Sequence, residues 1–288
     1  MQHIQRSTIS VEDVTLAYAE VGSGRPVVYI HGALMTLEEG LISLAPTLSP
    51  HVRLIAFDRP GHGDSGRDLT TGSPWRQARL IHDALQTMEV FDPVIVGHSF
   101  GGAVALAYAL QFPDDLAGVV ALAPIAFPEA RMEQVMFGMR TIPGAGDILS
   151  MLSMPADEMV LPLLYRGMFL PQAMPDGFKT DFPFAVASRR SQLRADGEEA
   201  ALMAASLGRS AMSYWTCRAP VTVIQGDSDI VVNPHLHGRI LAAILPNGSF
   251  TSLKGLGHMA HHAAPEVVLD AVQAMFLAQE PSRPALAA

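Results

Sequence analysis

The sequence predicts an α/β fold with a mostly parallel, doubly wound sheet, and three observations lead to that prediction. Six apolar runs lack the polar alternation of a half-exposed strand, which is typical of strands buried on both faces. Stretches with helical spacing separate most of these runs, and a strand, helix, strand order favours parallel pairing. The chain has 288 residues, 49% of them apolar, so it can bury a substantial core. In such sheets the chemistry lies at the carboxyl ends of the strands.

The predicted elements follow in a regular order from the N-terminus. Residues 7 to 21 alternate between polar and apolar side chains and stop at GSGRP, which predicts two antiparallel strands and a turn. The six apolar runs predict strands at 27 to 30, 53 to 57, 93 to 97, 116 to 123, 221 to 226 and 249 to 253. Helical spacing predicts helices near 37 to 48, 74 to 88, 101 to 112, 234 to 244 and 265 to 279.

The regular order is interrupted once, between Phe127 and about Cys217. This stretch has no strand-like run, and its helical patches alternate with prolines at 143, 155, 162, 171, 175 and 183. We therefore expect a core formed by residues 1–126 and 218–288, with an inserted helical subdomain at 127–217 and a frayed tail at 281–288. Ten of the fifteen methionines lie in the insert. They can adapt the insert to apolar ligands or form its own helical core, and the two roles are compatible.

Charge and cysteine content limit the class of partner. The chain has 28 acidic and 19 basic residues, and no Lys/Arg run exceeds two, so nucleic acid and anionic membrane are poor partners. The single cysteine excludes an internal disulfide and fits a reducing compartment. The N-terminus lacks a signal-peptide pattern, and no run of about 18 apolar residues occurs. We expect a soluble, cytoplasmic protein with a small-molecule substrate, while the oligomeric state is not indicated.

The segment GHSFGG, residues 97 to 102, connects a predicted buried strand directly to a predicted helix. A turn this sharp holds the residue at its apex, Ser99, in a strained backbone conformation. Gly97 and Gly101 have no side chains to collide as strand and helix close on each other, and Gly102 eases the packing further. The serine oxygen is then exposed at a helix N-terminus, where negative charge is favoured. The pattern predicts a nucleophile at Ser99.

A second serine motif, GDSG at 63 to 66, resembles the serine region of trypsin-like proteases. The second glycine that follows there is Arg67 in this chain, and the predicted fold is not an all-β double barrel. We therefore expect Ser65 to belong to a turn after the strand at 53 to 57.

Five segments resemble motifs of one known superfamily. They are HGAL at 31 to 34, DRPGHGDS at 58 to 65, GHSFGG at 97 to 102, QGDSDIVV at 225 to 232 and GHMAHHAAPE from 257. Together they resemble the α/β-hydrolase fold superfamily over nearly the whole chain, most weakly between 127 and 217. The resemblance implies a nucleophile, an acid and a histidine in that chain order, and a helical cap where this chain has its insert.

The resemblance implies that His258 is the base that takes the proton of Ser99, because the superfamily histidine lies between the last strand and the last helix. His261 and His262 are close rivals by spacing, but they lie where the last helix begins, so we expect pocket lining or helix surface. His98 points away from the apex in this arrangement and is expected to pack. The three clustered histidines lack an H-E-x-x-H pattern or a cysteine pair, so we expect no metal and no cofactor.

Two carboxylates follow the strand at 221 to 226, where the superfamily acid belongs. The spacing in GDSDIVV matches the family at Asp229 and leaves Asp227 for a local turn hydrogen bond. Some members hold the acid after the preceding strand, but here that strand is followed by no carboxylate before Glu129. Asp229 is therefore the predicted partner of the histidine.

Two backbone N–H groups are implied as the oxyanion hole. They belong to Phe100, just after the nucleophile, and to Ala33, in the loop that begins with His31 and Gly32. We expect an apolar pocket that suits a substrate with an apolar portion. The candidate lining residues are Leu34, Met132, Met136 and Met168.

The expected function is that of a cofactor-independent serine hydrolase resembling carboxylesterases, which cleave an ester through an acyl-enzyme. Dehalogenases and epoxide hydrolases of this fold carry Asp at the apex, so Ser99 favours acyl transfer. Lactonase, carbon–carbon bond hydrolase, perhydrolase and proline iminopeptidase activities remain alternatives, and a hydrolase-like ligand receptor is an alternative of another class. The iminopeptidase alternative needs a carboxylate to hold an amine, and those available are Glu133, Glu158, Glu198 and Glu199.

Overall fold

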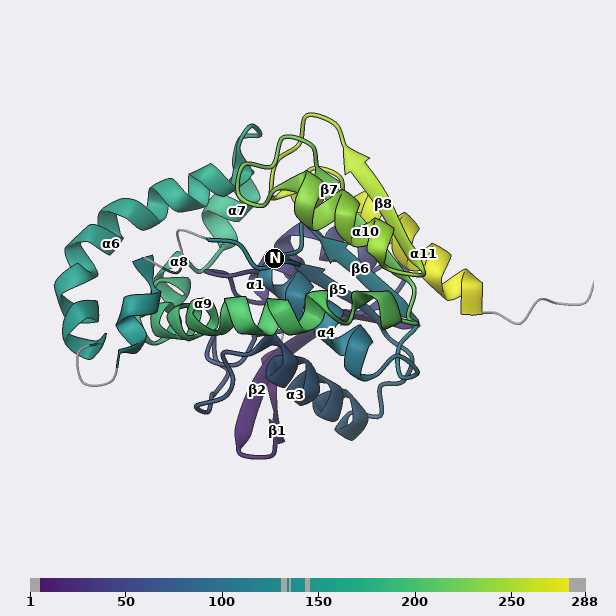
Figure 1. Ribbon diagram of the computed structural model, residues 1–288, viewed down its shortest axis with the longest axis horizontal. Coiled ribbons are helices and arrows are strands. Elements are labelled where there is room, and N and C mark those ends of the chain that lie inside the picture. Colours follow the sequence, from purple (N-terminus) through teal and green to yellow (C-terminus); the bar gives the residue numbers. More distant parts are fainter. Residues whose placement is uncertain (1–5, 131–133, 135, 143–145, 280–288) are drawn as a thin grey trace, which may run out of the picture.

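The computed structural model describes residues 6–130, 134, 136–142 and 146–279, and its centre is one sheet (Figure 1). The described strands are β1 (Arg6–Val11), β2 (Val14–Gly22), β3 (Pro26–Ile30), β4 (Arg53–Phe57), β5 (Val94–His98), β6 (Gly118–Leu122), β7 (Val221–Gly226) and β8 (Gly248–Leu253). They are ordered β1-β2-β4-β3-β5-β6-β7-β8. The β1–β2 and β2–β4 pairs are antiparallel and the other pairs are parallel, which confirms the predicted fold class.

Helices connect most of the parallel strands. Those outside the insert are α1 (Glu38–Ser43), α2 (Ala45–Leu48), α3 (Pro74–Thr87), α4 (Phe100–Gln111), the π-helix η3 (Pro234–Ile240), α10 (Leu241–Ile244), η4 (Ala260–His262) and α11 (Pro265–Gln279). The predicted helix at 37 to 48 is divided in two at Leu44. Pro46 explains the break, because its ring lacks an N–H and clashes with the carbonyl four residues earlier. No helix in the described part of the chain has the length and apolar character needed to cross a membrane.

Successive side chains of the central strands enter two different cores. Val28 and Ile30 of β3 pack in a cluster with α3 and α4 on one face of the sheet. Val27 and Tyr29 of the same strand pack with α1, α2 and α11 on the other face. Because both faces are covered, the strand needs apolar residues at every position, which is why its sequence does not alternate.

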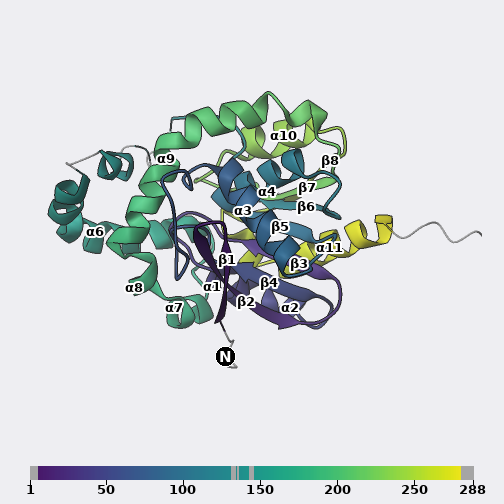
Figure 2. The same ribbon diagram turned by 90° about the horizontal axis from the view of Figure 1, so that it is seen from below.

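Between β6 and β7 the described residues form helices and no strand. These elements are η1 (Gly138–Thr141), α6 (Gly146–Phe169), α7 (Asp176–Asp181), α8 (Phe184–Ala187), α9 (Arg190–Ala211) and η2 (Tyr214–Thr216). Figures 1 and 2 show α6, α7 and α8 on the opposite side of the molecule from α11. A third apolar cluster joins the insert, through Phe137, Tyr165 and Leu193, to Leu34 and Met259 of the loops after β3 and β8. The insert therefore lies over the carboxyl ends of the parallel strands.

Candidate active site

The turn between β5 and α4 holds Ser99 in a strained conformation. Its φ is +53° and its ψ is −113°, a region that non-glycine residues rarely adopt. Two backbone hydrogen bonds fix it from both sides, because Ser99 N–H donates to the carbonyl of Leu122 at 2.9 Å and Ile125 N–H donates to the carbonyl of Ser99 at 3.1 Å. Strain held this firmly by neighbouring structure is typical of a functional residue.

The glycines of this turn lie where the backbone has no room for a side chain. A Cβ on Gly97 would overlap the carbonyl oxygen of Gly101, and a Cβ on Gly101 would overlap that of Ile30. A Cβ on Gly102 would lie 2.7 Å from Cβ of Pro124. The three glycines therefore let strand and helix meet at the distance that the sequence motif implies.

The loop after β3 passes directly beside Ser99. A Cβ on Gly32 would lie 3.0 Å from Nδ1 of His98 and 3.3 Å from Cβ of Ser99, which is a tight fit against both side chains. Ala33 follows Gly32 in this loop. Phe100 is the first residue of α4, so its backbone N–H has no acceptor within that helix. The two backbone groups predicted as oxyanion donors thus belong to segments that meet at Ser99.

Buried polar contacts hold this loop in place. Arg59 is completely buried, and its guanidinium donates to the carbonyls of His31 at 2.9 Å and Gly32 at 3.1 Å. Its backbone N–H donates to Nε2 of His31 at 2.9 Å, while Nδ1 of His31 donates to the carbonyl of Gly32 at 2.8 Å. Burial, followed by the charge of Arg59, holds the pKa of His31 well below its usual range. His31 is therefore a neutral, structural histidine at neutral pH.

His258 and Asp229 form a buried hydrogen-bonded pair. Nδ1 of His258 lies 2.9 Å from Oδ2 of Asp229, and the backbone N–H groups of Val231 and Val232 donate to Oδ1 at 2.8 and 2.9 Å. Burial alone would raise the pKa of Asp229, but the interaction with His258 and the two N–H bonds outweigh it and lower the pKa to about 2. Asp229 is thus ionised at neutral pH and keeps a proton on Nδ1 of His258, which leaves Nε2 as a proton acceptor.

His258 lies against the turn that carries Ser99. Its ring centroid is 4.7 Å from that of His98, and Nε2 of His98 lies 3.3 Å from the carbonyl oxygen of His258. Nδ1 of His98 lies 2.6 Å from Oε1 of Glu39. The other oxygen of Glu39 accepts from Gly32 N–H at 2.9 Å. Glu39 and His98 thus connect the loop beside Ser99 with the backbone of His258, a role beyond the packing predicted for His98.

Comparison with known proteins identifies the family. A family model described as alpha/beta hydrolase fold matches residues 25–265. The chain belongs to the alpha/beta hydrolase fold family. This hydrolase is 27% identical to an uncharacterised protein of Mycobacterium tuberculosis over 282 residues, which cover 92% of the chain and 79% of the relative. It is also 27% identical to a haloalkane dehalogenase of Mesorhizobium japonicum over 271 residues, which cover 90% of the chain and 85% of the dehalogenase.

Solved structures of the family superpose on most of this hydrolase. A thermophilic esterase from Thermogutta terrifontis, determined with malate bound, is 21% identical, with a TM-score of 0.64 and coverage of 95% of this chain and 98% of the esterase. An alpha/beta hydrolase fold protein from Burkholderia ambifaria is 20% identical, with a TM-score of 0.75 and coverage of 94% and 99%. Likeness at this level of identity shows the shared fold.

The structure places the rival residues of this hydrolase outside the pair formed by His258 and Asp229. Asp227 is exposed and accepts a hydrogen bond from Gly255 N–H at 2.7 Å, which is the local role expected for it. The hydroxyl of Ser65 donates to the carbonyl of Asp58 at 2.7 Å and accepts from Ala17 N–H at 2.8 Å. Ser65 is therefore engaged in a turn, as predicted.

Two buried groups of side chains in this hydrolase have the composition of a metal site. The first group consists of Glu39, His98 and His261. Oε1 of Glu39 lies only 2.6 Å from Nδ1 of His98, a separation that suits a shared proton better than two ligands of one metal ion. In the second, Arg59 contacts Glu199 directly, so its positive charge opposes a cation at that carboxylate. We interpret both groups as proton-linked polar networks.

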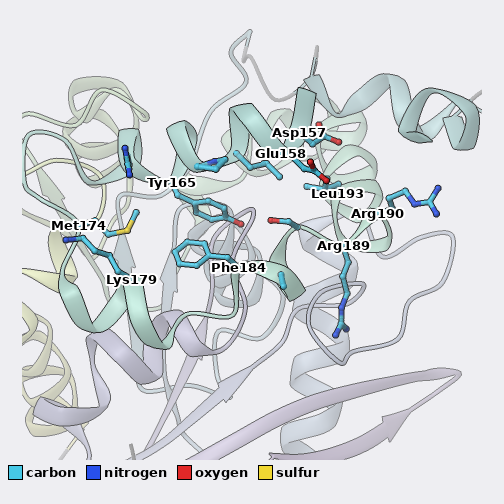
Figure 3. Close-up of a pocket in the computed structure, with 14 residues that line it drawn as sticks. Asp157, Glu158, Tyr165, Met174, Lys179, Phe184, Arg189, Arg190 and Leu193 are labelled. Carbon is cyan, nitrogen blue, oxygen red and sulfur yellow. The ribbon is translucent and has the colours of Figure 1, made fainter. Parts of the chain in front are cut away.

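Two cavities lie near or within the insert of this hydrolase. A small one of about 20 Å³ is bounded by Ala33, Leu34 and Phe100 on the core side. A larger one of about 830 Å³ lies among α6, α7, α8 and α9 (Figure 3). Tyr165 and Phe184 both line it, and the centroids of their rings are 4.9 Å apart. The hydroxyl of Tyr165 donates to the carbonyl of Leu34 at 3.0 Å, so one side chain links the larger cavity to the loop beside Ser99.

The predicted pocket residues have different positions. Leu34 lines the small cavity. Met136 and Met168 are partly buried against the apolar cluster between insert and core, and neither is among the residues that bound these two cavities. Met132 lies outside the described residues. Met203 of α9, which the sequence did not single out, does line the small cavity.

We expect His262 to make the stability of this hydrolase depend on pH. Its ring packs between Phe169 and Phe178 of the insert, with centroid distances of 5.2 Å to each. Burial lowers its pKa from 6.5 to about 4, although the charge of Glu39 raises it and His98 lowers it. Because the folded-state pKa is lower than the unfolded one, protonation favours unfolding as pH falls from 6.5 toward 4. We expect a loss of at most about 3 kcal/mol of unfolding free energy from this group.

Chemical denaturation at a series of pH values would measure this dependence. His262→Gln should show a smaller loss of stability between pH 6.5 and 4 than the wild-type protein. Replacement of the exposed His51 by glutamine is the matched control and should leave the wild-type dependence unchanged. Identical curves for wild type and His262→Gln would contradict the assignment.

Proposed function

We propose that this hydrolase is a serine carboxylesterase that cleaves esters through an acyl-enzyme. The observation that carries the proposal is the strained Ser99, with φ +53°, on a turn against which the hydrogen-bonded pair of His258 and Asp229 packs. A serine hydroxyl is a weak nucleophile unless a neighbouring base removes its proton, and His258 is the base that lies at this turn.

The proposed reaction gives each of these residues a role. Ser99 Oγ attacks the ester carbonyl carbon while His258 Nε2 takes its proton, and the backbone N–H groups of Ala33 and Phe100 stabilise the oxyanion. His258 then protonates the leaving alcohol as the carbon–oxygen bond breaks. Water, deprotonated by His258, attacks the acyl-enzyme and releases the carboxylic acid and Ser99. Asp229 remains ionised throughout and stabilises the imidazolium.

The choice of nucleophile separates this proposal from the activity of the dehalogenase relative. A carboxylate that displaces a halide forms an ester, which water can hydrolyse. A serine oxygen in the same displacement would form an ether, which the site has no means of cleaving. Ser99 is therefore suited to acyl transfer, and the structurally similar esterase supports the same class of reaction.

Steady-state hydrolysis of p-nitrophenyl esters of increasing acyl length tests the proposal. We expect many product molecules per protein molecule, with a preferred acyl length set by the space beneath the insert. A burst that stops at one product per protein would instead indicate a receptor that is acylated once. Folded protein that releases no p-nitrophenol from any member of the series would contradict the carboxylesterase proposal.

A further inference from the structure

The loop that carries Ala33 is held by a carboxylate to which the proposed reaction gives no role. Glu39 is the second residue of α1 and is completely buried. Its Oε2 accepts from Gly32 N–H at 2.9 Å. A buried carboxylate is costly unless charged and hydrogen-bonding partners compensate it. The partners of Glu39 therefore show what its carboxylate holds together.

Gly32 is held on both sides of its α-carbon. Its N–H is bound by Glu39, while its carbonyl oxygen accepts from Arg59 at 3.1 Å and from His31 at 2.8 Å. Glycine has the greatest backbone freedom of all residues, and these bonds fix both peptide planes that meet at Gly32. The N–H of a trans peptide points away from its C=O, so the bound Gly32 carbonyl sets the direction of Ala33 N–H. Glu39 fixes the preceding peptide, which Arg59 and His31 leave free at its N–H.

The second oxygen of Glu39 faces His98. Oε1 lies 2.6 Å from Nδ1 of His98, whose side chain is also buried. Burial alone would raise the pKa of Glu39, but the charge of His98 and the bond from Gly32 N–H outweigh it and lower the pKa. The carboxylate is therefore ionised at neutral pH. His261 Nε2 lies 3.8 Å from Oε1, but burial holds the pKa of His261 well below its usual range, so the counter charge comes from His98.

Glu39 thereby bridges the two segments that supply the proposed oxyanion donors. Gly32 directly precedes Ala33, and His98 lies two positions before Phe100. The parallel ladder between β3 and β5 ends before Gly32 and His98, so it does not fix the separation of the two segments at this level. A side chain that contacts both segments can fix it, and Glu39 does so from a third element.

We propose that Glu39 is a positioning residue of the oxyanion hole, which sets the distance between the N–H groups of Ala33 and Phe100 through its contacts with Gly32 and His98. This inference rests on the proposed esterase function and adds to it a residue that touches neither substrate nor reacting atoms. Oxyanion donors stabilise the transition state more than the bound ester. Displacing one of them therefore lowers kcat and leaves KM nearly unchanged.

Two conservative substitutions separate the reach of this side chain from its charge. Glu39→Gln removes the charge but keeps an oxygen for Gly32 N–H, and its amide can donate to Nδ1 of a neutral His98. It should keep kcat within a few-fold of the wild-type value. Glu39→Asp keeps the charge but is one methylene shorter, so it cannot hold both partners at the same distances. It should lower kcat for a p-nitrophenyl ester by about 10- to 100-fold, with KM changed by no more than about 2-fold.

A transition-state analogue gives an independent readout. With a trifluoromethyl ketone, Ser99 Oγ would bond to the carbonyl carbon, His258 would take the serine proton, and the carbonyl oxygen would become the oxyanion. The inhibition constant should rise in Glu39→Asp by about the factor by which kcat/KM falls. Glu38→Gln and Glu38→Asp are the matched controls, because Glu38 is the neighbouring residue of α1 and pairs with Arg6. Both controls should match the wild type in kinetics and in inhibition.

Either variant can overturn the proposal by itself. A loss in Glu39→Gln as large as that expected for Glu39→Asp would show that the charge, and not the reach, matters. Wild-type kinetics in Glu39→Asp would show that the contacts of Glu39 do not position the donors.

Hydrogen exchange separates the positioning role from the esterase function. If the wild-type protein hydrolyses no ester, the esterase proposal fails, and the exchange rate of Gly32 N–H, measured by NMR, then tests the positioning. Faster exchange in Glu39→Asp than in Glu39→Gln would support the hold on this loop without the esterase function. Equal exchange in the two variants would exclude it.

Discussion

Ser99→Ala is expected to lower kcat/KM for ester hydrolysis by about 10⁴- to 10⁶-fold without unfolding the protein. The substitution removes the only oxygen that the turn after β5 presents at its apex. Alanine and serine have similar preferences at positive φ, so the strain at this position does not change. The residual rate would come from the oxyanion donors acting on a water molecule.

Steady-state kinetics of purified wild type and variant on one p-nitrophenyl ester would measure this loss. Ser65→Ala is the matched control, because Ser65 lies in the second serine motif and its hydroxyl is engaged with Asp58 and Ala17. Ser65→Ala should retain activity in the range of the wild type, with some loss of stability. Full activity of Ser99→Ala would show that another residue is the nucleophile.

Asp229→Asn is expected to lower kcat by about 10⁴-fold. The asparagine amide can donate to Nδ1 of His258, which favours the tautomer with the proton on Nε2. That tautomer cannot accept the proton of Ser99, so the geometry survives while the base is lost. The low pKa of Asp229, about 2, means that the wild-type protein does not suffer the same loss at mildly acidic pH.

The neighbouring carboxylate provides the control for this prediction. Asp227→Asn changes an exposed residue with the same charge, two positions away, which contacts Ser228 and Gly255. Its kcat should stay within a few-fold of the wild-type value. Equal losses in the two variants would indicate that the loop after β7 acts through its overall charge or stability and not through the contact of Asp229 with His258.

Local sequence patterns were sufficient to predict the fold and the sharp turn at Ser99. Buried parallel strands need apolar residues at every position, so β3 to β7 are visible as unbroken runs. The turn at Ser99 needs glycines where strand and helix close on each other, and the structure leaves no room for a side chain at Gly97 or Gly101. In both cases the physical requirement acts on residues that are close together in the chain.

The polar networks around the site could not be predicted in this way. Asp196 contacts Leu34 across 162 positions, and Glu199 contacts Arg59 across 140. Glu199 was one of four glutamates of the insert considered for holding an amine, and nothing in its local sequence indicated burial. The one available signal was the spacing of Asp196 and Glu199, three residues apart, which places them on one face of a helix. The contacts of Glu39 likewise depend on how the loops meet after folding.

The attachment of α9 to the loop after β3 limits how this hydrolase can be re-engineered. Asp196 binds Leu34 N–H, and Gln192 joins the carbonyl of Met35 to the N–H of Gly63 at 2.9 and 3.0 Å. A chimaera that received residues 127–217 from another member would lose these anchors, and the peptide next to Ala33 would be free to rotate. Transplanting substrate preference between members therefore requires moving α9 together with its matching loops, and α6 also needs its match there, because Tyr165 donates to the carbonyl of Leu34.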